Sequence, residues 1–155
     1  MMNKSVKLGI QGRPDVPPRL FDLVPRYIEK YGYKDCLFAG KVNKQWVKYD
    51  GKKFYEITNS ISYGLLKLGV KKGDRIALIA NNAPEWNMID FAIQQVGAIC
   101  IPIYPTISHD DYKYIFNHSE ASIAFFTNKH LYSKVADIIA DIPTIKETYL
   151  IRASE

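Results

Sequence analysis

Short apolar runs recur along the second half of the chain and alternate with segments whose apolar residues fall three or four positions apart. The runs are centred near residues 77, 101, 124 and 149, a period of about 24 residues. Strands and helices that alternate in this way typically form a parallel sheet, whose right-handed crossovers place helices on both faces. The pattern therefore predicts a three-layer α/β fold with a mostly parallel sheet.

The clearest repeat lies in the middle of the chain. The apolar runs Arg75–Ala80 and Ala98–Ile103 predict two strands, and the segment between them predicts a helix that Gly97 ends. Asn82 is expected to cap this helix, because asparagine is favoured at that position and a proline and a glutamate follow in the first turn. Both strands are expected to be covered on both faces, as parallel strands usually are.

Pro102 conflicts with an internal position for the second of these strands. A proline has no N–H to donate to a neighbouring strand, so within sheets it is found at edges or where pairing stops. Two explanations follow: the strand lies at an edge, or the proline marks the end of pairing. We favour the second explanation, because Tyr104 and Pro105 follow at once.

The N-terminal part of the chain predicts smaller elements. Residues 1–18 contain three prolines and little apolar periodicity, so we expect an extended arm, with the folded subdomain formed by residues 19–155. Residues 20–31 predict a short amphipathic helix. Pro25 either kinks this helix or lies in its first turn.

A β-hairpin and a long helix are expected next. Cys36–Ala39 and Gln45–Tyr49 predict two antiparallel strands joined by a turn. In the second strand Trp46 and Lys48 alternate with Val47 and Tyr49, so one side is expected to face solvent. Asp50 is expected to cap a helix over residues 51–68, which Gly69 ends. The apolar face of this helix is expected to consist of Phe54, Ile57, Ile61, Leu65 and Leu68.

Two further capped helices are expected after the central repeat. Ser108 and Asp111 have the spacing of a capping box at the start of one helix. Thr127 or Asn128 is expected to cap a second helix, which Pro143 closes. A last strand is expected at residues 147–151.

Composition and charge set limits on the environment and the partners. The chain has 155 residues and a net charge of +5, with many lysines between residues 41 and 72. These lysines indicate either a solvated face or attraction to an anionic surface, such as a membrane leaflet or ligand phosphates. No nucleic-acid recognition motif accompanies them. Cys36 and Cys100 fit a reduced, cytoplasmic setting, and no apolar run has the length of a membrane span or signal peptide.

Catalytic and metal-binding motifs are not found in the sequence. It contains no glycine-rich phosphate loop, no nucleophile turn and no zinc signature, and its three histidines are scattered. We therefore assign no catalytic, cofactor-binding or metal-ligating residue. Open α/β sheets bind ligands at the carboxyl ends of their strands. The residues there, which we take as candidate ligand-side positions, are Asn81, Asn82, Tyr104, Thr106, Thr127 and Asn128.

Three stretches resemble one enzyme family. GVKKGDRIALIANNAPEW and VGAICIPIYPT resemble the N-terminal part of the adenylate-forming acyl-CoA synthetases. The segments PIYPT and YIFNHSEAS are most similar to those of the long-chain fatty-acid–CoA ligases. The resemblance covers roughly residues 20–152, most of the chain.

The resemblance implies a parent enzyme that adenylates a fatty acid with ATP and then transfers the acyl group to CoA. It also implies that the phosphate-binding loop, the residues that hold ATP and Mg²⁺, and the C-terminal domain all follow the region covered here. We therefore expect the chain to be an N-terminal fragment, inactive alone, whose main partner is the remainder of the enzyme. Peripheral membrane contact is a further expectation.

Two alternatives remain open at the level of the sequence. One is a free-standing binding domain of the flavodoxin type. Such a domain would need acidic residues or a phosphate-binding loop at the carboxyl end of a strand, which the loops at residues 81–82 and 104–105 do not supply. The other is an interaction module that uses its lysine-rich face.

Overall fold

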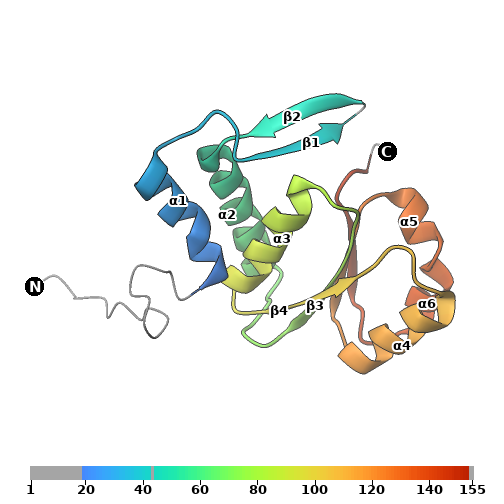
Figure 1. The fold of residues 1–155 in the computed structure, drawn as a ribbon. Helices are drawn as coiled ribbons and strands as arrows, with labels where there is room; N and C mark the ends of the chain where they lie inside the picture. Colours follow the sequence, from blue (N-terminus) through green and yellow to red (C-terminus); the bar gives the residue numbers. More distant parts are fainter. Residues whose placement is uncertain (1–18, 43, 154–155) are drawn as a thin grey trace, which may run out of the picture.

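The computed structural model describes residues 19–42 and 44–153. The extended arm expected at residues 1–18 lies outside the described residues. Two sheets are present: a two-stranded antiparallel hairpin and a four-stranded parallel sheet (Figure 1). The hairpin consists of β1 (Phe38–Val42) and β2 (Gln45–Tyr49), and the parallel sheet of β3 (Arg75–Ile79), β4 (Ile99–Ile103), β5 (Ile123–Phe126) and β6 (Glu147–Leu150).

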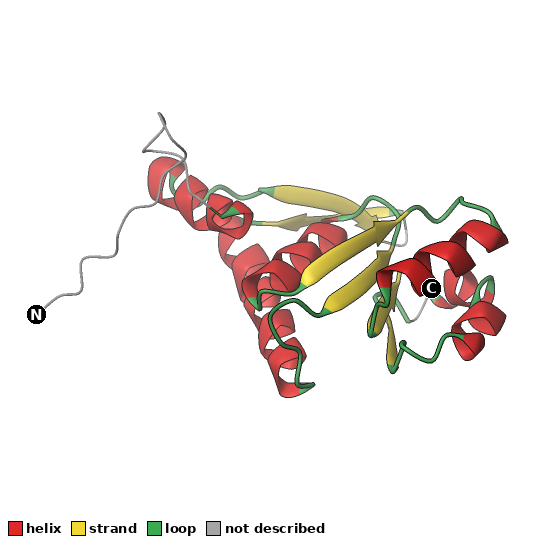
Figure 2. Ribbon diagram, turned by 90° about the horizontal axis from the view of Figure 1, so that it is seen from below, coloured by secondary structure: helices red, strands yellow, loops and turns green. Residues whose placement is uncertain are grey.

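The parallel sheet has the order β4-β3-β5-β6 and lies between two layers of helices (Figures 1 and 2). One face is covered by α2 (Gly51–Lys67) and α3 (Pro84–Gln95). The other face is covered by α4 (His109–Ser119), α5 (Lys129–Ser133) and α6 (Ala136–Asp141). The three-layer α/β architecture expected from the period of the apolar runs is confirmed.

Side chains of β3 alternate between the two cores. Ala77 and Ile79 face the core beneath α4, α5 and α6, whereas Ile76 and Leu78 face the core beneath α2 and α3. All four residues have 0% exposure, so β3 is the buried centre of the sheet. A strand covered on both faces needs apolar residues at every position, which is the pattern that its sequence shows.

β4 is an edge strand, and this corrects the explanation favoured for Pro102. The strand still packs on both layers of helices, since Cys100 contacts one core and Ile103 the other, and Ile99 at its start is 49% exposed. Pro102 does not end the pairing, because it stands opposite Leu78 and Ile103 still pairs with Ile79. The N–H of Ile99 donates to the carbonyl of Asp74 at 2.7 Å. Directions alternate along a strand, so the nitrogen of Pro102 faces the free edge, where a missing N–H breaks no ladder bond.

The long helix α2 begins and ends as its sequence predicts. The Oδ1 atom of Asp50 accepts a hydrogen bond from the N–H of Lys53 at 2.7 Å, and Gly69 adopts a positive φ of 84° just after the helix. The buried stripe differs from the expected apolar face. Leu68 is 49% exposed, and the polar residues Thr58 and Ser62 are buried where α2 packs on α3.

Local capping was predicted well in two places and wrongly in a third. Ser108 and Asp111 form the expected capping box, and the Oδ1 atom of Asn128 accepts a hydrogen bond from the N–H of Leu131 at 3.0 Å. Asn82 does not cap α3. The helix begins one residue later, with Ala83 as its N-cap and no side-chain hydrogen bond. The proline that follows has no N–H, which removes one of the donors that a cap would satisfy.

The last helical segment is divided in two, which the sequence did not indicate. One helix was expected after Asn128, but Val135 adopts φ −131° between α5 and α6 and breaks the helix there. The apolar spacing continues across the break, so that Leu131, Val135 and Ile138 still face one core.

The N-terminal elements form a third, smaller core against α2 and α3. A 3-10 turn (Leu20–Asp22) leads into α1 (Leu23–Tyr31), so that Pro25 lies in the first turn of this helix rather than at a kink. Phe54 of α2 is 1% exposed, and its ring stacks on Phe38 of β1 with the centroids 4.5 Å apart. The hairpin is thereby attached to the helical layer.

Candidate functional site

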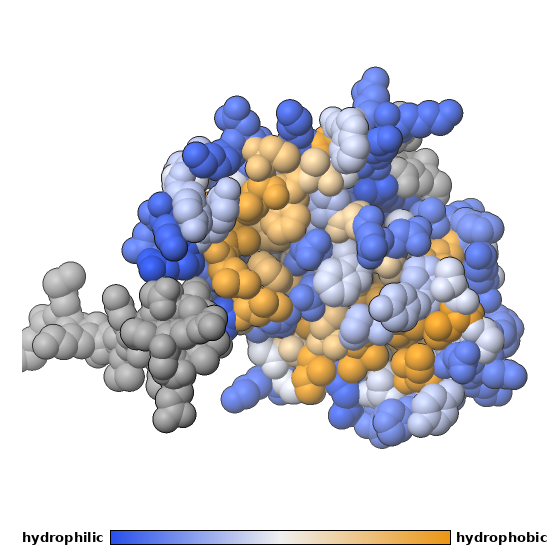
Figure 3. Space-filling model, in the orientation of Figure 1, coloured by the Kyte–Doolittle hydropathy of each residue, from blue (hydrophilic) through white to orange (hydrophobic). Residues whose placement is uncertain are grey.

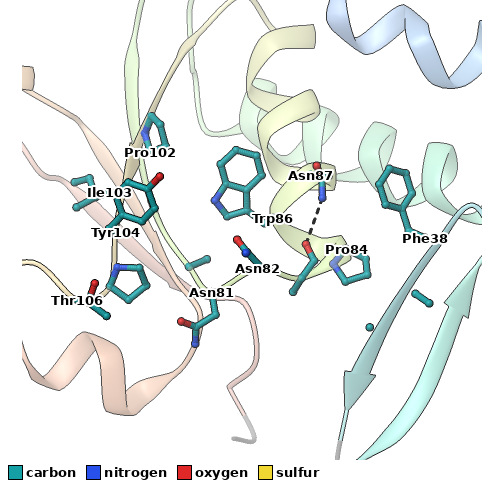
Figure 4. A pocket seen from close by; sticks show the side chains of 15 residues that line it. Phe38, Asn81, Asn82, Pro84, Trp86, Asn87, Pro102, Ile103, Tyr104 and Thr106 are labelled. Atoms are coloured by element: carbon teal, nitrogen blue, oxygen red, sulfur yellow. Dashed lines mark hydrogen bonds between the residues drawn. The ribbon is translucent and has the colours of Figure 1, made fainter.

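A pocket of about 840 Å³ opens at the carboxyl ends of β3 and β4. Its walls are the β3–α3 loop, the loop after β4 and one strand of the hairpin (Figure 4). The lining residues are Phe38, Ala39, Gly40, Ala80, Asn81, Asn82, Ala83, Pro84, Trp86, Asn87, Pro102, Ile103, Tyr104, Pro105 and Thr106.

Parallel pairing brings the two loops together. Ile79 and Ile103 stand opposite each other at the ends of β3 and β4, so the residues that follow them leave the sheet side by side. Asn81, Asn82, Tyr104 and Thr106 all line the pocket, and all four are exposed. Four of the six candidate positions are therefore gathered in one place. Their contact with a ligand stays a prediction.

The remaining two candidates, Thr127 and Asn128, have local structural roles outside the pocket lining. The hydroxyl of Thr127 accepts a hydrogen bond from the N–H of Asn81 at 2.9 Å, and the N–H of Thr127 donates to the carbonyl of Ile79 at 3.1 Å. Asn128 caps α5. The two hydrogen bonds of Thr127 join the end of β3 to the end of β5. The strand order reverses between these two strands, and flavodoxin-type sheets bind their ligand at that point.

Sequence reasoning missed the hairpin wall of the pocket. Gly40 of β1 lies so close to the start of α3 that a Cβ atom at residue 40 would come within 2.6 Å of the Cδ atom of Pro84. Glycine is therefore needed there for the hairpin to reach the loop. A glycine inside a strand is a recognised sign of close backbone approach, so Gly40 was the available signal.

Phe38, Trp86 and Tyr104 provide the aromatic surface of the pocket (Figure 4). Trp86 is partly buried and packs against the core beneath α3. Tyr104 is 80% exposed, but its backbone is held because the hydroxyl of Tyr112 donates to its carbonyl at 3.1 Å. The pocket thus combines a fixed indole with an exposed phenol ring.

An ion pair links the hairpin, α3 and the end of β6 beside this site. The Nη2 atom of Arg152 lies 3.2 and 3.1 Å from the two carboxylate oxygens of Glu85, and both side chains are largely buried. Nη1 of Arg152 also donates to the carbonyl of Lys41 in β1 at 3.4 Å. Burial, followed by the negative charge of Glu85, raises the pKa of Tyr49 in β2. This cluster fixes the hairpin relative to the sheet.

The donor set limits what the pocket can hold. Its lining offers three asparagine amides, aromatic rings, prolines and a threonine, and it includes no lysine or arginine. Phosphate groups need converging N–H donors and cationic side chains, so this lining does not fit a triphosphate. Within residues 19–42 and 44–153, no group of three or more His, Cys, Asp or Glu side chains could hold a metal ion.

Comparison with known proteins gives a family match over most of the chain. Residues 25–155 match the AMP-binding enzyme family. The chain is 35% identical over 91 residues to a long-chain-fatty-acid–CoA ligase, FadD15, of Mycobacterium bovis, covering 59% of this chain and 15% of that protein. It is 27% identical over 166 residues to long chain acyl-CoA synthetase 4 of Arabidopsis thaliana, covering 91% of this chain and 24% of that protein. The chain therefore spans less than a quarter of the length of these relatives.

Solved structures agree on the fold. A long-chain-fatty-acid-CoA ligase from Archaeoglobus fulgidus superposes with a TM-score of 0.76 at 21% identity, over 87% of this chain and 27% of that chain. An anthranilate CoA ligase in complex with anthranoyl-AMP superposes with a TM-score of 0.73 at 19% identity, over 88% of this chain and 26% of that chain. Because residues 25–155 match its model, we conclude that the chain belongs to the AMP-binding enzyme family.

Proposed function

We propose that the chain is the N-terminal part of a long-chain fatty-acid–CoA ligase. Such an enzyme activates a fatty acid with ATP to an acyl adenylate and then forms a thioester with CoA. The observation that carries the proposal is the family match over residues 25–155, supported by curated relatives whose names specify long-chain substrates.

The residues described here serve the parent enzyme as a scaffold, together with one wall of its substrate region. ATP and CoA are the co-substrates that the family implies, with Mg²⁺ as the metal cofactor, but the pocket lining does not fit the phosphate groups of either co-substrate. We therefore assign nucleotide binding and chemistry to the remainder of the parent, which is the main partner of this chain. The pocket is the surface that we assign to the substrate side.

The flavodoxin-like alternative is less well supported. The strand order β4-β3-β5-β6 does resemble that of flavodoxin-type sheets. However, the reversal point between β3 and β5 is occupied by the hydrogen bond from Asn81 to Thr127. The loops that line the pocket lie on the other side of β3, beside β4.

We place the parent enzyme in the cytoplasm, with peripheral contact to membranes, where long-chain fatty acids partition. The net charge of +5 supports attraction to anionic lipid. None of the described helices combines the length and the apolar character needed to cross a bilayer.

The test compares the 155-residue chain with a polypeptide extended to the length of the relatives. We expect calorimetric titration of the chain with Mg-ATP to show no micromolar binding, because about four negative charges need cationic partners that the pocket does not provide. We expect pyrophosphate release with palmitate and CoA only from the extended polypeptide. Turnover by the chain alone would contradict its role as a scaffold. Absence of pyrophosphate release from the extended polypeptide would contradict the ligase assignment.

A further inference from the structure

The outward side of the hairpin is basic and carries an exposed tryptophan. Lys41 stands opposite Trp46 in the antiparallel register, and Ala39 stands opposite Lys48. Residues directly opposite share a face, and all four are exposed. Lys44 adds a third exposed lysine at the turn. We call Lys41, Lys44, Trp46 and Lys48 the basic face of the hairpin.

The opposite side of the hairpin is the one that attaches to the protein. Phe38 and Tyr49 pack toward the N-terminal core, and Phe38 stacks on Phe54. This packing leaves the basic face turned outward. In Figure 3, hydrophilic side chains project along the edge of the molecule where Figure 1 shows the hairpin.

Trp46 has no packing role that explains it. Its exposed fraction is 65%, and the ammonium of Lys41 lies over its ring, 5.1 Å from the ring centroid. A large ring kept in water contributes little to folding, whereas the same ring is well placed at the headgroup level of a bilayer, where tryptophan is enriched.

The charge of the basic face is not neutralised by neighbouring residues. Between Phe38 and Tyr49 the sequence contains three lysines and no acidic residue. Lys52 and Lys53, both exposed, follow in the first turn of α2 and extend the positive area, although Lys52 lies 3.9 Å from the carboxylate of Glu56. A positive surface of this kind attracts the phosphate groups of anionic lipids.

We propose that the basic face of the hairpin is a docking surface for anionic phospholipid membranes, with Trp46 in the headgroup layer and the three lysines on lipid phosphates. The inference rests on the proposed function, because a membrane is where a long-chain ligase would find its substrate, and it gives the expected membrane contact a defined place. The attachment of the hairpin through Arg152 and Glu85 sets the docked orientation, and β1 of the same hairpin lines the pocket.

Vesicle flotation of the 155-residue chain is the first test. We expect it to float with vesicles of phosphatidylcholine containing 30% phosphatidylglycerol and not with phosphatidylcholine alone. Replacing Lys41, Lys44 and Lys48 by glutamine should lower the partition coefficient roughly 100-fold, at about fivefold for each lysine. The matched control replaces three exposed lysines elsewhere, Lys113, Lys129 and Lys134, and removes the same charge. Equal loss in both triple variants would overturn the proposal.

Trp46→Ala distinguishes insertion of the Trp46 ring into the headgroup layer from electrostatic attraction by the lysines. We expect it to weaken binding roughly tenfold, as burial of about 60 Å² of ring would predict, and the loss should persist in 0.5 M salt, where the lysine contribution is screened. No loss in this variant would exclude the insertion of the ring. Each variant should remain folded, because the replaced side chains are exposed. Circular dichroism melting verifies this.

The extended polypeptide distinguishes failure of this inference from failure of the proposed function. Its flotation should depend on the same hairpin residues, while its pyrophosphate release in a vesicle-free assay should be unchanged in the hairpin variants. Flotation of the chain but not of the extended polypeptide would show that the parent covers the hairpin, and would overturn the proposal. Tighter binding to single-stranded DNA than to the vesicles would overturn it in favour of nucleic acid.

Discussion

Phe54 is the side chain whose removal should have the largest effect on the N-terminal core. It is 1% exposed, it stacks on Phe38 at 4.5 Å, and its edge meets Phe91 of α3 with the centroids 5.8 Å apart. Phe54→Ala removes the buried ring and leaves a cavity, which typically costs about 3–5 kcal/mol. The two aromatic pairs place the expected loss toward the upper part of that range. For a chain of this size the loss corresponds to a decrease of roughly 10–15 °C in melting temperature.

Urea unfolding followed by circular dichroism measures this loss. The matched control is Tyr63→Ala on the same helix, because Tyr63 is 70% exposed and its truncation should change the free energy of unfolding by less than about 0.5 kcal/mol. Hydrogen exchange adds a second measurement, since the hairpin amides should lose protection in Phe54→Ala before those of β3 do. Equal effects of the two substitutions would refute the packing argument.

Two further predictions concern burial. Leu65→Asp should unfold the chain, because Leu65 is 2% exposed and an unpaired carboxylate there costs several kcal/mol. The control variant Leu66→Asp, at a position 52% exposed, should melt close to the wild type. Similar melting curves for the two variants would mean that the buried face of α2 is misassigned. A thiol reagent should modify Cys36 rapidly and Cys100 only after unfolding, because burial, followed by the nearby Asp90 carboxylate, raises the pKa of the Cys100 thiol. Raising the pH from 7 to 9 should therefore leave Cys100 unmodified in the folded chain, and two modified thiols in the folded chain would contradict this prediction.

Elements determined by local chemistry could be predicted from the sequence. Asp50 caps α2, and Ser108 with Asp111 forms a capping box, because each of these bonds joins residues only three positions apart. The parallel strands were also predictable. Their apolar runs lie in a regular alternation with amphipathic helices, and only a few topologies accommodate that alternation.

Features that depend on distant neighbours could not be predicted in the same way. The position of β4 at an edge is decided by the crossover that takes β5 to the far side of β3, and no residue near Pro102 encodes it. Gly40 meets Pro84 across more than forty residues of chain, so the hairpin wall of the pocket follows from tertiary packing alone. Buried Ser62 is a third case, since it donates to the side chain of Gln95 on the neighbouring helix at 2.5 Å.

The edge strand has a consequence for expression and handling of the chain. A free strand edge offers a row of donors and acceptors on which a second molecule can add a strand, a common first step in aggregation. Pro102 removes one donor from the middle of that row, because its nitrogen faces outward. Pro102→Thr would restore the donor without disturbing the bonds to β3, and should therefore make concentrated solutions of the chain more prone to form β-rich aggregates.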